Sequence, residues 1–199
     1  MDVTLVGEHV VRIGEDDGRA ALLVDGVVQS ISPQDGASRG GYWAAMVPQC
    51  KPARALILGL GGGTLAHLLM DRWGASTYIL GVDDDPAVLE VARTAGWLSL
   101  PGLHIVQEDA FAFLDACNER FDYVALDLYR GPHFVGRGLT RPFLRRLRAV
   151  LVPGGWLAVN LFRDSRTAQR IERVGRVFLV DHRVETGDNV VVFARKRRE

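Results

Sequence analysis

The chain has 199 residues, of which 48% are hydrophobic, and its 24 basic and 24 acidic side chains give a formal net charge of zero. This composition predicts a domain with a sizeable core and excludes a general electrostatic attraction to nucleic acid. No apolar run approaches the roughly 18 residues of a membrane span, and the first residues lack the basic and apolar regions of a secretion signal. Cys50 and Cys117 have no metal-ligand spacing and suit a reducing compartment. We therefore expect a cytoplasmic protein without membrane or nucleic-acid partners.

The first thirty residues predict a small antiparallel β-meander. Two β-prone runs, HVVRI and AALLV, come first. Asp25-Gly26 then lies between two apolar runs, and this pair predicts a tight hairpin because both of its residues adopt positive φ readily. A helix over 38–49 is expected next. We expect residues 1–50 to form one unit, a meander followed by a linking helix.

From Pro52 onward, strand and helix patterns alternate, which predicts right-handed crossovers and a parallel sheet. The predicted strands are 55–60, 77–83, 103–109, 121–129 and 156–162. The predicted helices are 64–73, 86–98, 110–118, 140–151 and 166–174. The last two runs, 176–184 and 189–196, are separated by only ETGD, which is too short for a parallel crossover. Residues 51–199 should therefore form an α/β domain with an antiparallel last strand.

A glycine-rich turn, GLGGGT from Gly59 to Thr64, follows the first of these strands and opens a helix. Residues without a Cβ let a ligand approach the backbone, and a helix N-terminus offers free N–H groups. Asp83 ends the second strand, where a carboxylate can accept hydrogen bonds from both ribose hydroxyls. Two ligand classes fit, a dinucleotide and S-adenosylmethionine. The dinucleotide fingerprint has Gly or Ala where Thr64 stands, so we favour S-adenosylmethionine.

Six segments extend this pattern from about Ala21 to Phe162. They are LLVDGVVQS, ALILGLGGGTLAHLL, GVDDDPAVLEVAR, QEDAFAFL, FDYVALDLY and LVPGGWLAVNLF. In their order and spacing the chain resembles the spermidine-synthase-like branch of the class I S-adenosylmethionine-dependent methyltransferases. The resemblance implies a Rossmann-like seven-stranded sheet with an antiparallel last strand. It also implies S-adenosylmethionine or its decarboxylated form as cofactor, and a homodimer paired through the β-meander.

The resemblance also implies a set of cofactor-binding residues. Asp83 takes the ribose hydroxyls, and Asp109 accepts from the adenine amino group. Asp109 fits equally well as the cap of its own helix, and Asp84 stands where the family has an aliphatic residue. The implied cofactor-binding set is Gln29, Gly59, Gly61, Gly63, Asp83, Asp84, Asp109 and Ala110.

Asp127 ends the fourth strand and matches the aspartate that deprotonates the attacking amine in aminopropyl transfer. Two departures argue against a polyamine substrate. Gly61 replaces an aspartate of the family's glycine loop. Arg130 replaces a second acid after the fourth strand, and an arginine there repels an ammonium group and favours a carboxylate or phosphate.

We therefore favour methyl transfer from S-adenosylmethionine to a small-molecule acceptor of acidic character. Asp127 would orient or deprotonate the acceptor, and Tyr129, Arg130 and His133 would bind it. Two alternatives stay open, an aminopropyltransferase that uses decarboxylated S-adenosylmethionine and a non-catalytic binding or scaffold protein. The histidines are scattered without ligand spacing, so no metal site is expected.

Overall fold

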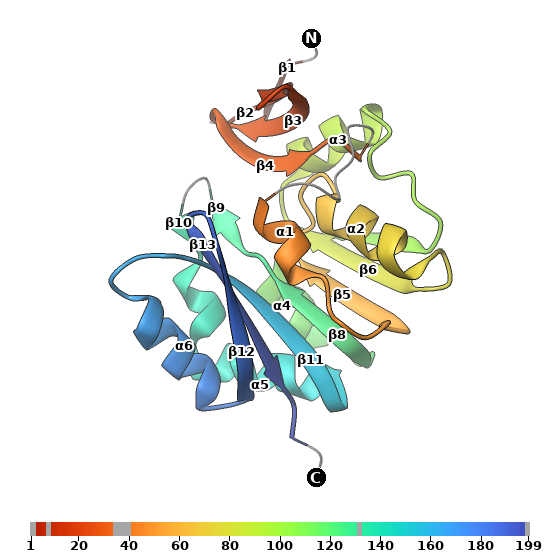
Figure 1. The fold of residues 1–199 in the computed structure, drawn as a ribbon. Helices are drawn as coiled ribbons and strands as arrows, with labels where there is room; N and C mark the ends of the chain where they lie inside the picture. Colours follow the sequence, from red (N-terminus) through yellow and green to blue (C-terminus); the bar gives the residue numbers. More distant parts are fainter. Residues whose placement is uncertain (1–2, 7–8, 34–40, 131–132, 198–199) are drawn as a thin grey trace.

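The structure of the protein is a computed structural model, and the residues that it describes are 3–6, 9–33, 41–130 and 133–197. A seven-stranded central sheet carries helices on both faces, and a second, smaller sheet lies beside one end of it (Figure 1). Among the described helices, none has the length and apolar character needed to cross a membrane.

The central sheet confirms the predicted architecture. Its strands, in pairing order, are β12 (Leu179–Thr186), β13 (Asn189–Arg195), β11 (Leu151–Phe162), β8 (Phe121–Leu126), β5 (Arg54–Leu58), β6 (Tyr78–Asp83) and β7 (Leu103–Gln107). The five strands from β11 to β7 run parallel, whereas β13 is antiparallel to both of its neighbours. The reversed last strand predicted from the short ETGD link is therefore present.

Helices pack against the two faces of this sheet, each over its own core. The first face carries α1 (Gly41–Met46), α2 (Thr64–Trp73) and α3 (Pro86–Thr94), and the second carries α4 (Ala110–Ala116), α5 (Arg141–Val150) and α6 (Thr167–Gly175). Along β5, Ala55 and Ile57 enter the first core, while Leu56 and Leu58 enter the second. Parallel strands covered on both faces are apolar throughout, which explains the continuous hydrophobic runs in the sequence.

Two boundaries differ from the predictions. The helix expected over 38–49 is shorter, because α1 spans Gly41–Met46, and 38–40 lie outside the described residues. β11 begins at Leu151, so the VPGG stretch expected to end a helix belongs to a strand. The pairing of β11 with β8 is interrupted between Leu151 and Trp156, and Gly154 adopts φ 79° in this irregular stretch.

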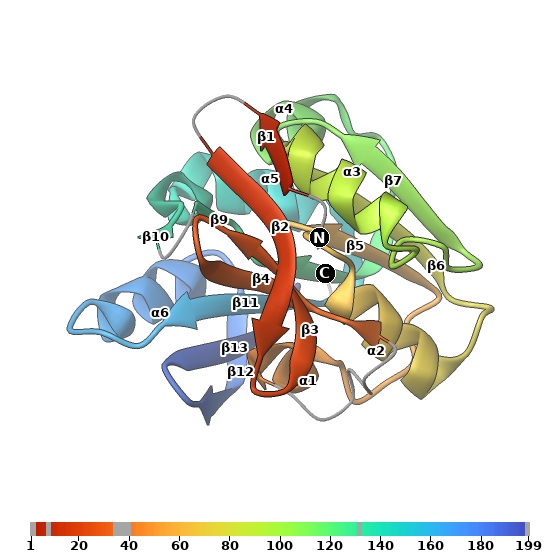
Figure 2. The ribbon, with the colours of Figure 1, turned by 90° about the horizontal axis from the view of Figure 1, so that it is seen from above.

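The N-terminal sheet is an antiparallel meander of β1 (Val3–Val6), β2 (His9–Asp16), β3 (Arg19–Val24) and β4 (Val27–Ile31). The hairpin at Asp25-Gly26 is confirmed, with φ of 50° and 81° at the two residues. Viewed from above, β2, β3 and β4 lie across the middle of the molecule, over the central sheet (Figure 2). The sequence did not predict β1 as a separate strand.

Buried hydrogen bonds join the meander to the start of α2. The Ile31 N–H donates to Thr64 Oγ1 at 2.9 Å, and the Thr64 hydroxyl donates to the Ile31 carbonyl at 3.1 Å. The Gly62 N–H donates to Ser30 Oγ at 2.6 Å. Thr64, the residue that departs from the dinucleotide fingerprint, therefore attaches the small sheet to the glycine loop.

Replacing Thr64 by Val keeps the side-chain shape but leaves two buried backbone groups of Ile31 without partners. We expect this change to lower the free energy of unfolding by about 1–3 kcal/mol, measured by urea denaturation. Thr77→Val is the matched control, because the buried Thr77 hydroxyl has no hydrogen-bond partner among the described residues. That variant should be neutral or slightly stabilising, and equal losses in the two variants would contradict the assigned role of Thr64.

Candidate active site

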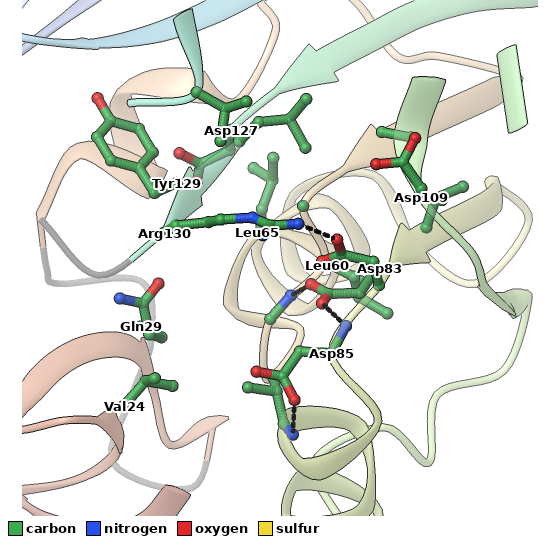
Figure 3. A pocket seen from close by; sticks show the side chains of 18 of the residues that line it. Val24, Gln29, Leu60, Leu65, Asp83, Asp85, Asp109, Asp127, Tyr129 and Arg130 are labelled. Atoms are coloured by element: carbon green, nitrogen blue, oxygen red, sulfur yellow. Dashed lines mark hydrogen bonds and ion pairs between the residues drawn. The ribbon is translucent and has the colours of Figure 1, made fainter. Parts of the chain in front are cut away.

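A cavity of about 860 Å³ opens at the carboxyl ends of the parallel strands, between them and the N-terminal meander (Figure 3). In open α/β sheets this edge is where ligands bind. Most of the residues singled out from the sequence line it, namely Gln29, Gly59, Gly61, Asp83, Asp84, Asp109, Ala110, Asp127, Tyr129 and Arg130. Among the described residues, no group of His, Cys, Asp and Glu is arranged to hold a metal ion.

Two of the residues singled out from the sequence are not among the described residues that line the cavity. Gly63 is not on the cavity wall: it is the N-cap of α2 with φ 87°, and a Cβ there would lie 2.9 Å from a methyl carbon of Leu98. His133 pairs through its backbone with Arg130 in the short hairpin of β9 (Tyr129–Arg130) and β10 (His133–Phe134). The side chain of His133 lies outside the described residues.

The backbone N–H groups of the glycine loop are used within the protein. From Gly59 to Gly63, each backbone N–H donates to an acceptor within the protein. The acceptors, in chain order, are Val82 O for Gly59 (2.9 Å) and Leu60 (3.1 Å), Asp83 Oδ2 for Gly61 (2.7 Å), Ser30 Oγ for Gly62 (2.6 Å) and Leu60 O for Gly63 (3.0 Å). The loop therefore offers a ligand close approach to its backbone but no unused donor along this stretch.

Asp83 stands at the end of β6, half-buried in the cavity wall. Its Oδ2 accepts the Gly61 N–H at 2.7 Å, and its Oδ1 accepts the Asp85 N–H at 3.1 Å. Burial raises the pKa of Asp83 to about 6, against the lowering effect of these two hydrogen bonds. Each carboxylate oxygen can still accept a further bond from a ligand.

Two nearby aspartates cap helices. Asp85 Oδ1 accepts the N–H groups of Ala87 and Val88 at the start of α3. Asp109 Oδ1 likewise accepts from Phe111 and Ala112 at the start of α4. The capping role considered for Asp109 is therefore present, and it uses only one of the two carboxylate oxygens of a residue that lines the cavity.

Asp127 follows β8 and is held by side chains from two other elements. Asn160 of β11 donates its amide to Asp127 Oδ1 at 2.8 Å, and the Tyr42 hydroxyl of α1 also donates to this carboxylate. Asn189 donates to the Asn160 side-chain oxygen at 2.9 Å, which fixes the Asn160 amide with its NH2 toward Asp127. Burial raises the pKa of Asp127 to about 6, partly offset by the bonds from Asn160 and Tyr42.

The sequence reasoning missed Asn160 and Asn189. Asn160 is 1% exposed and interrupts the apolar run WLAVNLF. A polar residue within such an apolar run was the signal in the sequence that could have identified it. Asn189 carries no comparable signal, because it begins its strand directly after a turn.

An ion pair crosses the cavity. Arg130 of β9, labelled in Figure 3, extends to Asp84, after β6, and its Nη2 lies 2.9 Å from Asp84 Oδ2. The arginine side chain is 76% exposed and the aspartate 46%. The pair therefore joins two walls of the cavity at its solvent side.

The raised pKa values of Asp83 and Asp127 predict a pH dependence of stability. An unfolded aspartate titrates near about 3.9, whereas these two titrate near about 6 in the folded protein. Between these pH values the folded state binds more protons, so their contribution to the free energy of unfolding is full below about pH 4 and decreases as pH rises through 6.

We expect Asp83→Asn to remove part of this decrease. Relative to the wild type, the variant should gain on the order of 2–3 kcal/mol between pH 4 and pH 7, measured by urea denaturation across that range. Asp71→Asn, on the exposed side of α2, serves as the control. Parallel pH profiles for the wild type and Asp83→Asn would contradict the raised pKa.

Comparison with known proteins identifies the family of the chain. Residues 55–155 match a family model described as a methyltransferase domain. A polyamine aminopropyltransferase of Pyrobaculum neutrophilum is 32% identical over 161 residues, which cover 74% of this chain and 54% of that protein. A trans-aconitate 2-methyltransferase of Methylobacterium nodulans is 33% identical over 117 residues, which cover 59% of this chain and 41% of that protein. The chain spans 40% or less of the aminopropyltransferases of Vibrio vulnificus and Mycobacterium tuberculosis.

Solved structures share the fold. A probable spermidine synthase from Corynebacterium glutamicum aligns with a TM-score of 0.81 at 19% identity, over 98% of this chain and 79% of that one. Human methyltransferase-like protein 13, in complex with SAH, aligns with a TM-score of 0.64 at 21% identity, over 74% and 73%. The spermidine-synthase-like architecture expected from the sequence is therefore confirmed as a fold.

Proposed function

We propose that this chain, which belongs to the methyltransferase-domain family, binds S-adenosylmethionine in the cavity and transfers its methyl group to a small-molecule acceptor. One observation carries the proposal: the Gly59–Gly61 loop, Asp83 and Asp127 line a single cavity at the carboxyl edge of the sheet. A structural neighbour with the same fold holds SAH, the product of methyl transfer.

In this proposal Asp83 accepts the ribose hydroxyls, because each of its oxygens retains acceptor capacity. Asp109 and Ala110 face the adenine, and Gly59 and Gly61 allow the methionine part to lie against the backbone. Gln29, on β4, closes the opposite side of the cavity.

We propose that Asp127 is the general base that deprotonates the acceptor. Methyl transfer from a sulfonium is a displacement that depends mainly on alignment, and a carboxylate can orient and deprotonate an acceptor hydroxyl or amine. Its pKa of about 6 leaves it ionised at neutral pH yet more basic than an ordinary aspartate. Tyr129 lines the same wall.

Aminopropyl transfer is the second candidate, and the polyamine aminopropyltransferase of P. neutrophilum favours it through 32% identity over 74% of this chain. Calorimetric titration with S-adenosylmethionine, decarboxylated S-adenosylmethionine and NAD separates the candidates. We expect S-adenosylmethionine to bind most tightly. Preference for the decarboxylated form would support aminopropyl transfer, and binding of none of the three would support a scaffold protein.

We also propose that residues 1–50 and 51–199 form two domains joined at the glycine loop, and that the meander pairs two subunits. The bonds of Ser30 and Ile31 to the start of α2 support the first part. Sedimentation that shows only a 21.9 kDa species would refute the homodimer.

A further inference from the structure

The cavity presents a problem for any ligand that carries a carboxylate. Seven acidic residues and two arginines are among the described residues that line it. The acids are Asp25, Asp83, Asp84, Asp85, Glu108, Asp109 and Asp127. The N–H groups from Gly59 to Gly63 are all used within the protein. A ligand carboxylate therefore meets a negative field and finds no unused donor on the glycine loop.

The two arginines of the lining are not equivalent. The Arg137 guanidinium lies 4.4 Å from the centre of the Phe111 ring, beside α4. Arg130 extends instead over the cavity (Figure 3) and forms an ion pair with Asp84. A guanidinium has five N–H donors, and Arg130 uses one nitrogen for the contact with Asp84. Its remaining donors can engage a second carboxylate.

From this arrangement we infer that Arg130 is the carboxylate-binding residue of the cavity and that Asp84 holds it in place until a ligand carboxylate takes over the pairing. The inference rests on the proposed function, since it concerns ligands of the same cavity. The ion pair can be exchanged at little cost, because an exposed ion pair contributes little to stability and the side chains of Arg130 and Asp84 are 76% and 46% exposed. The carboxylate can belong to the methionine part of the donor or to the acceptor.

The inference predicts effects of opposite sign for the two partners of the pair. Arg130→Gln removes the cation, so a ligand with a carboxylate should bind about tenfold more weakly, as expected for loss of a charge-assisted hydrogen bond. Asp84→Asn removes the competing acid while it keeps the side-chain shape, so the same ligand should bind a few-fold more tightly, by about 2–5-fold. An ion pair with only a structural role would change affinity in the same direction in both variants.

The experiment is a calorimetric titration of the wild type, Arg130→Gln, Asp84→Asn and the control Arg145→Gln. In the first arm the ligands are S-adenosylmethionine and its decarboxylated form, which differ only in the carboxylate. In the second arm the ligand is tricarballylate, a simple tricarboxylate, titrated with and without saturating S-adenosylhomocysteine. Arg145→Gln should change each affinity by less than about twofold, because this exposed arginine of α5 is not among the described residues that line the cavity.

If Arg130→Gln weakens and Asp84→Asn strengthens the binding of S-adenosylmethionine, while the affinity for the decarboxylated form shows no matching loss, the carboxylate belongs to the methyl donor. Opposite effects on tricarballylate alone identify the acceptor. Unchanged affinities in both arms, or equal losses for S-adenosylmethionine and its decarboxylated form, overturn the inference. If the wild type binds neither adenosyl ligand, the proposed function fails, and the tricarballylate arm alone decides the inference.

Discussion

Replacing Asp127 by Asn is expected to abolish transfer while binding of S-adenosylmethionine is retained. The amide cannot accept a proton from the acceptor, and loss of a positioned general base typically reduces turnover by about 100-fold or more. The dissociation constant of S-adenosylmethionine should stay within about threefold of the wild type, because the proposed donor contacts come from other residues. The readout is formation of S-adenosylhomocysteine with an acceptor identified by screening.

The same variant should be more stable than the wild type at pH 8. Burial raises the pKa of Asp127 to about 6, so the ionised carboxylate destabilises the folded state above that pH. A neutral side chain of the same shape removes this cost, and loss of activity with gain of stability is the signature of a functional residue held in an unfavourable environment. Asp71→Asn, on the exposed side of α2, should change neither property. Unchanged turnover in Asp127→Asn would refute the catalytic role.

Most of the fold follows from local patterns in the sequence. The alternating strands and helices, the Asp25-Gly26 hairpin and the reversed last strand depend on periodicity, turn chemistry and link length. The errors occur where pairing with a segment distant in sequence determines the secondary structure. Val3–Val6 becomes a strand because it pairs with β2. The stretch after Leu151 continues as strand because β11 pairs with β8 on both sides of the irregularity.

In the candidate site, likewise, some residues are predictable from local sequence patterns, whereas others depend on contacts between distant segments. Asp83 and Asp127 end parallel strands, so topology alone brings them to one edge of the sheet. The residues that hold Asp127 come from elsewhere: Asn160 of β11 donates to Asp127, and Asn189 of β13 donates to Asn160. The N–H groups of Gly61 and Gly62 are already used within the protein, because Asp83 and Ser30, both distant in sequence, accept from them. The pairing of Arg130 with Asp84 likewise requires the folded chain.

Gly59 couples the glycine loop to the proposed base, and Gly59→Ala is expected to disrupt both. Gly59 adopts φ 88°, and a Cβ there would lie 2.1 Å from the Asp127 carbonyl oxygen. The added methyl group must therefore displace the backbone of Asp127 as well as strain its own residue. We expect the free energy of unfolding to fall by at least about 3 kcal/mol, from positive-φ strain and overpacking together, and binding of S-adenosylmethionine to weaken at least about tenfold.

Gly74→Ala separates the two causes. Gly74 adopts a nearly identical φ of 83° at the end of α2, and a Cβ there has no neighbour within 4 Å. That variant should lose only the strain of its own backbone conformation, φ 83° and ψ 170°, which side chains other than glycine rarely adopt, about 1–3 kcal/mol, and should bind S-adenosylmethionine as the wild type does. Urea denaturation and calorimetric titration of both variants provide the comparison. Equal losses of stability in Gly59→Ala and Gly74→Ala would mean that the contact with Asp127 does not explain the need for glycine at position 59. The glycine loop would then accommodate the added methyl group without displacing the end of β8.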